Sequence, residues 1–208
     1  DFLHDLLLLR VGGEKELELA LRFQQVTGPV AAKGIEDTAL YCFNRLVACN
    51  EVGGDPSQLG GTPEGFHRAM AEARRRHPRR LVTTSTHDAK RSGDVRARLA
   101  LLSEIPGRWS AAVRRWRRLN APYRRGADLP TANAEYLLYQ TLVGAWPIAT
   151  DRVVRYMRKA AREAKTQTSW TRRDPDYEEA LVDFVEGVLA DDRFVDELRS
   201  FVEPLVEP

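Results

Sequence analysis

Cysteine is scarce in this 208-residue sequence, which contains only Cys42 and Cys49. If both lie on one helix, their seven-residue spacing separates them by roughly 10 Å, which exceeds the roughly 7 Å that a disulfide spans. Free thiols are therefore expected, as is typical of the reducing cytoplasm. This low cysteine content excludes a small secreted domain held together by disulfides.

Long apolar runs are also missing. The N-terminal stretch DFLHDLLLLR contains a leucine run that is too short to span a bilayer. It has neither a basic leader region nor a cleavage site, so we expect no targeting segment and no membrane span, and we predict a cytoplasmic location. The sequence starts without Met inside this apolar pattern, and we expect it to be a piece of a longer protein.

Net charge is nearly absent, at +2, so the overall charge indicates no partner. With 43% hydrophobic and 30% charged residues, the composition is that of an ordered soluble protein. The charges are unevenly distributed, however. Residues 174–208 contain twelve acids and two arginines, a net charge of −10, and the remainder therefore has a net charge of +12.

Apolar spacing and capping residues predict a mostly helical chain. Thr62 followed by Pro63 is a typical helix start, and Thr27-Gly28-Pro29 is expected to break a helix. The β-branched stretch from Leu81 to Ser85 predicts one strand. Helices are expected at about residues 1–25, 36–50, 62–77, 92–104, 107–120 and 150–164. One further helix is expected to end before Pro147, and two more are expected after residue 174.

The most unusual stretch is LVTTSTHDAKRSGDVR, residues 81–96, where His87 and Asp88 follow the predicted strand. Both side chains are metal ligands, but neighbours on a strand diverge, and the other histidines have no ligand spacing. A metal-dependent phosphohydrolase site is therefore one hypothesis. A second is a sugar site, in which the carboxylate accepts hydrogen bonds from hydroxyls. A purely structural capping Asp beside a satisfied His is equally compatible with the spacing.

Two other features have structural and functional interpretations. Lys33, Glu36, Asp37 and Thr38 cluster at a helix start, where acids complement the helix dipole, whereas Lys33 has no such role. Residues 108–125 contain seven arginines and no acid, with two interleaved tryptophans. This segment, together with RRRHPRR, could bind nucleic acid or an acidic partner. Its tryptophan spacing instead favours an amphipathic helix whose arginine face pairs with the acidic C-terminal helices.

Several motifs in succession resemble maltooligosyl trehalose synthase, a family of the α-amylase superfamily. They are RFQQVTGPVAAKGIEDTALYCFNRLVACNEVGGDP, TTSTHDAKRSGDVRARLALLSEIP, WRRLN, NAEYLLYQTLVGAWP and YMRKAAREAKTQTSW. The resemblance implies an isomerase that rearranges the reducing-end α-1,4 linkage of maltooligosaccharides into an α,α-1,1 linkage. It implies no cofactor and no metal, a maltooligosaccharide substrate, no nucleic-acid or membrane partner, and leaves the oligomeric state open.

The resemblance also implies roles for individual residues. Asp88 in TSTHDAK would be the superfamily's transition-state-stabilising carboxylate, and His87 would bind the same sugar. Lys90 and Lys33 would hold the leaving glucose, which must turn over and attack the glycosyl-enzyme before water does.

This sequence departs from the family pattern because no motif matches the nucleophilic Asp or the acid/base Glu, so the chain alone is expected to be inactive. The remainder of the catalytic chain would be its partner. We expect a mainly α helical assembly with one or two short strands, derived from the late part of a (β/α)8 barrel plus a helical insertion. Residues 1–105 would be the late barrel with helical excursions, and residues 106–208 a helical subdomain. The alternative function is a helical module whose arginine-rich face binds nucleic acid or an acidic partner.

Overall fold

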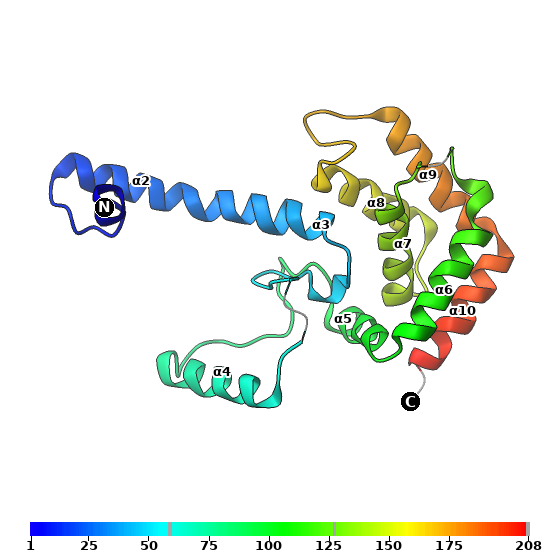
Figure 1. The fold of residues 1–208 in the computed structure, drawn as a ribbon, viewed down its shortest axis with the longest axis horizontal. Coiled ribbons are helices and arrows are strands. Elements are labelled where there is room, and N and C mark those ends of the chain that lie inside the picture. The colour runs from blue at the N-terminus through cyan, green and yellow to red at the C-terminus, as the bar shows by residue number, and fades with distance from the viewer. Residues whose placement is uncertain (58–59, 127, 207–208) are drawn as a thin grey trace.

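The computed structural model describes residues 1–57, 60–126 and 128–206, and all regular elements in these ranges are helices. In Figure 1 a packed body contains α5 to α10, while α2 and α4 project from it. No described helix combines the length and apolar character needed to cross a bilayer. The elements are α1 (Phe2–Leu7), α2 (Glu14–Ala31), the π-helix η1 (Ala32–Ala39), α3 (Leu40–Cys42), η2 (Val47–Cys49), α4 (Pro63–Arg76), α5 (Gly93–Ala100), η3 (Leu101–Ser103), α6 (Pro106–Leu119), η4 (Ala121–Tyr123), α7 (Ala132–Ala145), α8 (Thr150–Ala164), α9 (Pro175–Ala190) and α10 (Asp192–Val206).

Capping residues explain where several helices begin. The Thr62 hydroxyl accepts a hydrogen bond from the Gly65 N–H at 3.0 Å, which confirms the predicted start of α4. Asp174 caps α9 in the same way, accepting from the Tyr177 N–H at 3.0 Å. Each cap satisfies one of the N–H groups that a helix start leaves without an intrahelical partner.

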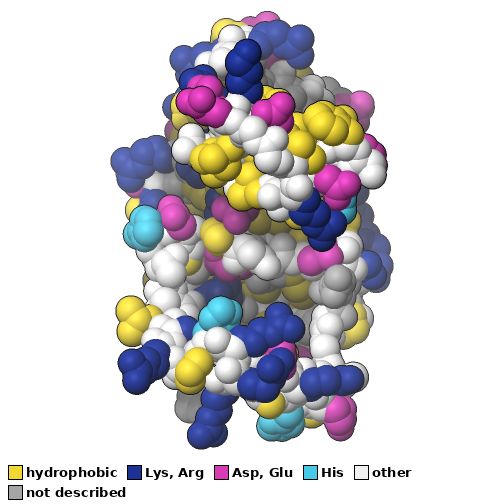
Figure 2. Space-filling model, turned by 90° about the vertical axis from the view of Figure 1, so that its left-hand side faces the viewer, with side chains coloured by type: hydrophobic (Ala, Val, Ile, Leu, Met, Phe, Trp, Pro, Cys, Tyr) yellow, Lys and Arg dark blue, Asp and Glu magenta, His cyan; other side chains and the backbone are white. Residues whose placement is uncertain are grey.

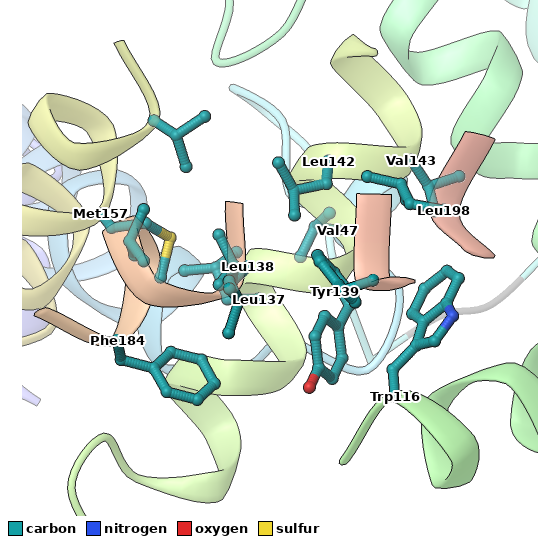
Figure 3. Packing of buried hydrophobic residues seen from close by; sticks show 14 of the residues in the cluster. Val47, Trp116, Leu137, Leu138, Tyr139, Leu142, Val143, Met157, Phe184 and Leu198 are labelled. Atoms are coloured by element: carbon teal, nitrogen blue, oxygen red, sulfur yellow. The ribbon is translucent and has the colours of Figure 1, made fainter. Parts of the chain in front are cut away.

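The core is built around α7, which is buried along most of its length. Beside it, Trp116 of α6 is fully buried, and its ring meets those of Tyr139, Phe194 and Phe201 at centroid distances of 5.4–5.8 Å. Figure 3 displays part of this cluster, with Trp116, Tyr139 and Leu198 close together. Aromatic side chains bury the largest areas per residue, so this contact is a main source of stability.

A polar side chain on α7 fixes the segment that leads to the candidate site. Gln140 is fully buried, its Oε1 accepts from the Val47 N–H at 2.9 Å, and its Nε2 donates to the Asn44 carbonyl at 2.7 Å. Asn50 closes the same segment by donating to the carbonyls of Leu40 and Phe43 at 2.8 and 2.7 Å. Backbone groups of the segment from Leu40 to Val47 are thereby satisfied in the interior.

The projecting arm, which is formed by α1 and α2, exposes apolar side chains. α1 folds back on α2, where Gln24 Nε2 donates to the Leu7 carbonyl at 3.0 Å. Figure 2 views the molecule from the arm's side, and hydrophobic side chains gather there beside charged ones. The exposed apolar residues of α1, α2 and η1 include Phe2, Leu3, Leu17, Leu19, Leu21, Phe23, Val26, Val30 and Ile35.

The predicted strand from Leu81 to Ser85 is wrong, and no strand occurs in the described parts of the chain. Leu81 is 100% exposed and Val82 77% exposed, and the segment has no neighbouring strand. Residues with strand composition need ladder partners and a packed face, and this stretch has neither. The mainly helical character is confirmed, whereas the one or two short strands are not.

The predicted break at Thr27-Gly28-Pro29 is also wrong. α2 continues through Pro29 to Ala31 and passes directly into η1. Proline removes one intrahelical hydrogen bond, and the bonds that follow still form, since the Ala32 N–H reaches the carbonyls of Gly28 and Pro29. The irregularity lies a turn later, where the wider π-helix includes Gly34.

The division at residue 105 stays a prediction. One hydrophobic cluster contains Val47 and Leu99 from before that position and Trp116, Leu142 and Phe184 from after it. The body therefore packs as a continuous core across the predicted boundary.

Replacing Trp116 by Ala is expected to lower the free energy of unfolding by about 3–5 kcal/mol, because it leaves a large cavity in the buried aromatic cluster. Guanidinium denaturation followed by circular dichroism measures this change. The matched control is Leu81→Ala, at a fully exposed position, for which a change within about 0.5 kcal/mol is expected. A loss below about 1 kcal/mol for Trp116→Ala would contradict the proposed importance of the cluster.

Candidate functional site

Two lysines predicted to bind substrate converge on one carboxylate. Lys33 Nζ donates to Asp37 Oδ2 at 2.5 Å, and Lys90 Nζ donates to Asp37 Oδ1 at 2.9 Å. Lys33 and Asp37 lie four residues apart in η1, while Lys90 belongs to the segment that follows Asp88. The fold therefore brings together two positions that are 57 residues apart in the sequence.

The two ammonium groups have different surroundings. The Lys33 side chain is 75% exposed, whereas that of Lys90 is 14% exposed. Lys90 Nζ lies 5.7 Å from the centre of the Tyr41 ring, and Lys159 Nζ lies 5.1 Å from the same ring and donates to the Tyr41 hydroxyl at 2.9 Å. Lysine ammonium groups are attracted to aromatic faces in this geometry.

The Asp37 carboxyl is strongly acidic. Hydrogen bonds from Lys33 and then Lys90 lower its pKa from 3.8 to about 2. Asp37 is therefore ionised throughout the neutral range and balances part of the positive charge around it. In turn, the hydrogen bond to Asp37 raises the pKa of Lys33.

Glu51 fixes the backbone next to the lysine. Its carboxylate accepts from the N–H groups of Lys90 at 2.8 Å and Arg91 at 3.3 Å. Burial opposes its ionisation, but the backbone hydrogen bonds outweigh that effect and lower the pKa of Glu51. The Arg91 guanidinium holds the same segment from the other side, donating to the Val47 carbonyl at 3.1 Å and the Tyr156 hydroxyl at 2.8 Å.

His87 and Asp88 lie on the surface. His87 Nε2 is 3.1 Å from Asp88 Oδ2, and their side chains are 90% and 70% exposed. The Asp88 N–H donates to the Thr86 hydroxyl at 3.2 Å, so a local turn places the pair. The predicted residues thus divide into two lysines that share one anion and a His-Asp pair open to solvent.

A hollow of about 190 Å³ lies beside the pair. Glu51, Val52, Arg96 and residues 83–86 line it, together with Ala89. Neither His87 nor Asp88 lines this hollow. The lining includes four residues with hydroxyl side chains, Thr83, Thr84, Ser85 and Thr86.

The metal hypothesis gains no geometric support. Among residues 1–57, 60–126 and 128–206, no three His, Cys, Asp or Glu side chains are grouped so that they could hold a metal ion. Cys42 and Cys49 are free thiols, as predicted, although they lie in α3 and η2 and not on one helix.

The arginine-rich helix pairs with acids of the same chain, as its amphipathic pattern predicts. Arg115 of α6 forms an ion pair with Glu197 of α10, and Arg125, which lies beyond the end of α6, binds Glu179 at 3.1 Å and Asp183 at 2.5 Å on α9. These contacts occupy arginines that the nucleic-acid hypothesis requires to be available.

Sequence reasoning missed Asp37 and Glu51 as parts of the site. The position of Asp37 predicts an acid that complements a helix start, although a Lys-to-Asp spacing of four residues is also a pairing signal on helices. No comparable signal exists for Glu51, since its contacts with Lys90 and Arg91 span 39 and 40 residues.

Comparisons with known proteins give a consistent result, although no family model matches the chain. A Mycobacterium tuberculosis protein named "Putative maltooligosyl trehalose synthase" is 36% identical over 195 residues, which cover 90% of this chain and 24% of that protein. The maltooligosyltrehalose synthase structure from Arthrobacter ramosus is 39% identical, with a TM-score of 0.77, and the match covers 89% of this chain and 24% of that one. A hypothetical maltooligosyl trehalose synthase from Sulfolobus tokodaii is 30% identical, with a TM-score of 0.78, and the match covers 92% and 27%.

The agreement covers both sequence and fold, and it extends over nearly all of this chain. The chain spans about a quarter of the length of the proteins it matches. Over about nine-tenths of its length, the chain is homologous to the maltooligosyl trehalose synthases, and it corresponds to a partial region of them.

Proposed function

We propose that this chain is the part of a maltooligosyl trehalose synthase that supplies the transition-state-stabilising carboxylate, Asp88, and three substrate-binding residues, His87, Lys90 and Lys33. The observation that carries the proposal is the convergence of Lys33 and Lys90 on Asp37. The family resemblance implies that both lysines bind the same leaving glucose, and two groups that bind one sugar ring must lie close together. The homology supports the family part of the proposal.

The proposed substrate is a maltooligosaccharide, and the reaction converts its terminal α-1,4 linkage into an α,α-1,1 linkage. Asp88 accepts hydrogen bonds from two neighbouring hydroxyls of the glucose whose bond is cleaved, and its negative charge stabilises the oxocarbenium-like transition state. His87 donates a hydrogen bond to the same sugar. Lys90 and Lys33 hold the glucose on the other side of the broken bond.

The exposure of Asp88 is compatible with this role. A carboxylate that is 70% exposed on an irregular segment is free to meet a ligand, whereas one buried among helices is not. Electrostatic stabilisation is weak in water and strengthens when water is excluded. The proposal therefore requires the remaining catalytic polypeptide to cover the His-Asp pair, together with the sugar.

That remaining polypeptide is the proposed partner of this chain. We propose that residues 1–105 are the late portion of the catalytic barrel, with helical excursions, and that residues 106–208 form a helical subdomain. The exposed apolar side chains of the α1–α2 arm are in keeping with a segment that packs against further protein. We call the protein formed by this segment and the remaining three quarters the complete synthase.

Incubation of the 208-residue chain with maltopentaose is expected to give no trehalosyl product. Double displacement requires a nucleophilic carboxylate and an acid/base carboxylate in addition to Asp88, and no motif in this chain matches either. Anion-exchange chromatography of the products measures the outcome, with the complete synthase as positive control. Appearance of the α,α-1,1-linked product would overturn the assignment of these roles to other segments.

In the complete synthase, Asp88→Asn is expected to lower kcat roughly hundred- to thousand-fold, because the amide carries no negative charge with which to stabilise the transition state. Steady-state assays on maltopentaose measure kcat, and circular dichroism checks that the fold is kept. Asp176→Asn, a matched loss of one exposed acid at the start of α9, is the control and should leave kcat near its original value. Near-normal turnover of Asp88→Asn would refute the role given to Asp88.

A further inference from the structure

We propose that Asp37 is a positioning residue: it holds the Lys33 and Lys90 ammonium groups side by side, so that the two together retain the leaving glucose. This inference rests on the proposed function, which assigns the lysines to that glucose. Asp37 itself touches no substrate in this scheme and acts through the lysines.

The geometry supports a role in which the Asp37 carboxylate holds both lysine heads. Each oxygen of the Asp37 carboxylate accepts from a different lysine, at 2.5 Å for Lys33 and 2.9 Å for Lys90. An ammonium group has three donors, and each lysine uses one of them on Asp37. Both lysines therefore keep donors for sugar hydroxyls while their heads stay next to each other.

Charge explains why an anion is needed at this place. Lys90 and Lys159 approach the same Tyr41 ring, at 5.7 and 5.1 Å, and Lys33 pairs with the second oxygen of Asp37. Three ammonium groups at such short range repel one another. Without the Asp37 carboxylate, the exposed Lys33 side chain has the most freedom to move away, and the spacing between the two sugar-binding heads is lost.

The backbone near Lys90 does not depend on Asp37. Glu51 holds the Lys90 and Arg91 N–H groups, and the Arg91 guanidinium is bound to Val47 and Tyr156. Removing the Asp37 charge should therefore release the lysine heads and leave the segment in place. This separation makes a positioning role distinguishable from a structural one.

The consequence for the reaction follows from its two steps. First, the C1–O4 bond of the substrate breaks as the nucleophilic carboxylate forms an ester with C1, and the acid/base group gives its proton to O4 of the leaving glucose. The retained glucose then turns over, and its anomeric oxygen attacks C1. The ester bond breaks, the α,α-1,1 bond forms, and the proton of the attacking hydroxyl returns to the acid/base group.

Water competes with the retained glucose for the same ester. If water attacks, its oxygen bonds to C1 as the ester bond to the nucleophilic carboxylate breaks, its proton goes to the acid/base group, and free glucose is released together with a shortened oligosaccharide. The ratio of trehalosyl product to free glucose thus reports how well the leaving glucose is held. A loosened pair of lysines lowers this ratio even if the first step is little affected.

The test is Asp37→Asn in the complete synthase, with maltopentaose as substrate. The ratio of trehalosyl product to free glucose is expected to fall about tenfold, the effect of losing one charge-assisted interaction. Total cleavage of the α-1,4 linkage should fall by less than that factor. Both products are quantified by anion-exchange chromatography from the same reaction, and the melting temperature is recorded for each variant.

Two variants sharpen the result. Asp37→Glu keeps the negative charge and is expected to restore most of the ratio. Asp196→Asn removes an exposed acid that pairs with Arg199 at 3.0 Å on α10, and this matched control should leave the ratio unchanged. If Asp37→Asn does not fold, Asp37→Glu carries the test, with a smaller shift toward glucose in the same direction.

The outcomes separate the two proposals. An unchanged ratio, or a parallel loss of cleavage and transfer, would mean that Asp37 is only structural; the inference would be wrong and the proposed function would stand. If the unaltered complete synthase makes no trehalosyl product, the proposed function fails, and the inference fails with it.

Discussion

The burial of α7 is the constraint on which the rest of the structure depends. This helix is covered along most of its length, so its one buried amide, Gln140, can contact only protein. Gln140 satisfies both of its polar groups on the segment from Asn44 to Val47. A buried amide left without partners is costly, and the need to satisfy it fixes where that segment runs.

The candidate site follows from this placement by a short chain of contacts. The Val47 carbonyl accepts from the Arg91 guanidinium, and Glu51, four residues beyond Val47, accepts from the N–H groups of Lys90 and Arg91. The core therefore sets the position of the Lys90 backbone, although the segment that contains Lys90 has no regular secondary structure. Another carboxylate is likewise bound by side chains of the same chain. Glu178 is nearly buried and is held by Arg162 at 2.6 Å and by the Thr168 hydroxyl at 2.9 Å.

Local signals in the sequence predicted much of this fold, because they act within one turn of chain. Thr62 caps the helix that it is predicted to cap, and the spacing of Trp109 and Trp116 places both in the core. The expected strand at Leu81–Ser85 failed for the opposite reason. A strand is defined by its partner, and composition alone contains no information about whether a partner is present.

The site was predictable to a similar degree. The motif containing His87 and Asp88 marked one segment, and that containing Lys33 marked another, but nothing local indicated that Asp37 joins them across 53 residues. The role of Glu51 could not be predicted for the same reason, since a side chain that binds distant backbone N–H groups leaves no spacing pattern in the sequence. Long-range hydrogen bonds depend on the packing of the helices between their partners, and only the three-dimensional structure shows that packing.

The two parts of the site differ in how far contacts within this chain fix their geometry. The lysine heads have an internal anion, and the Lys90 backbone has Glu51, so their geometry is set before any ligand arrives. Within the described parts of the chain, Asp88 is placed only by a local turn and the adjacent His87, and its side chain is 70% exposed. Catalytic groups act efficiently when neighbouring contacts lock them in place. Under the proposed function, the contacts that lock Asp88 would come from the sugar and from polypeptide outside this segment, whereas the grip on the leaving glucose would be built within it.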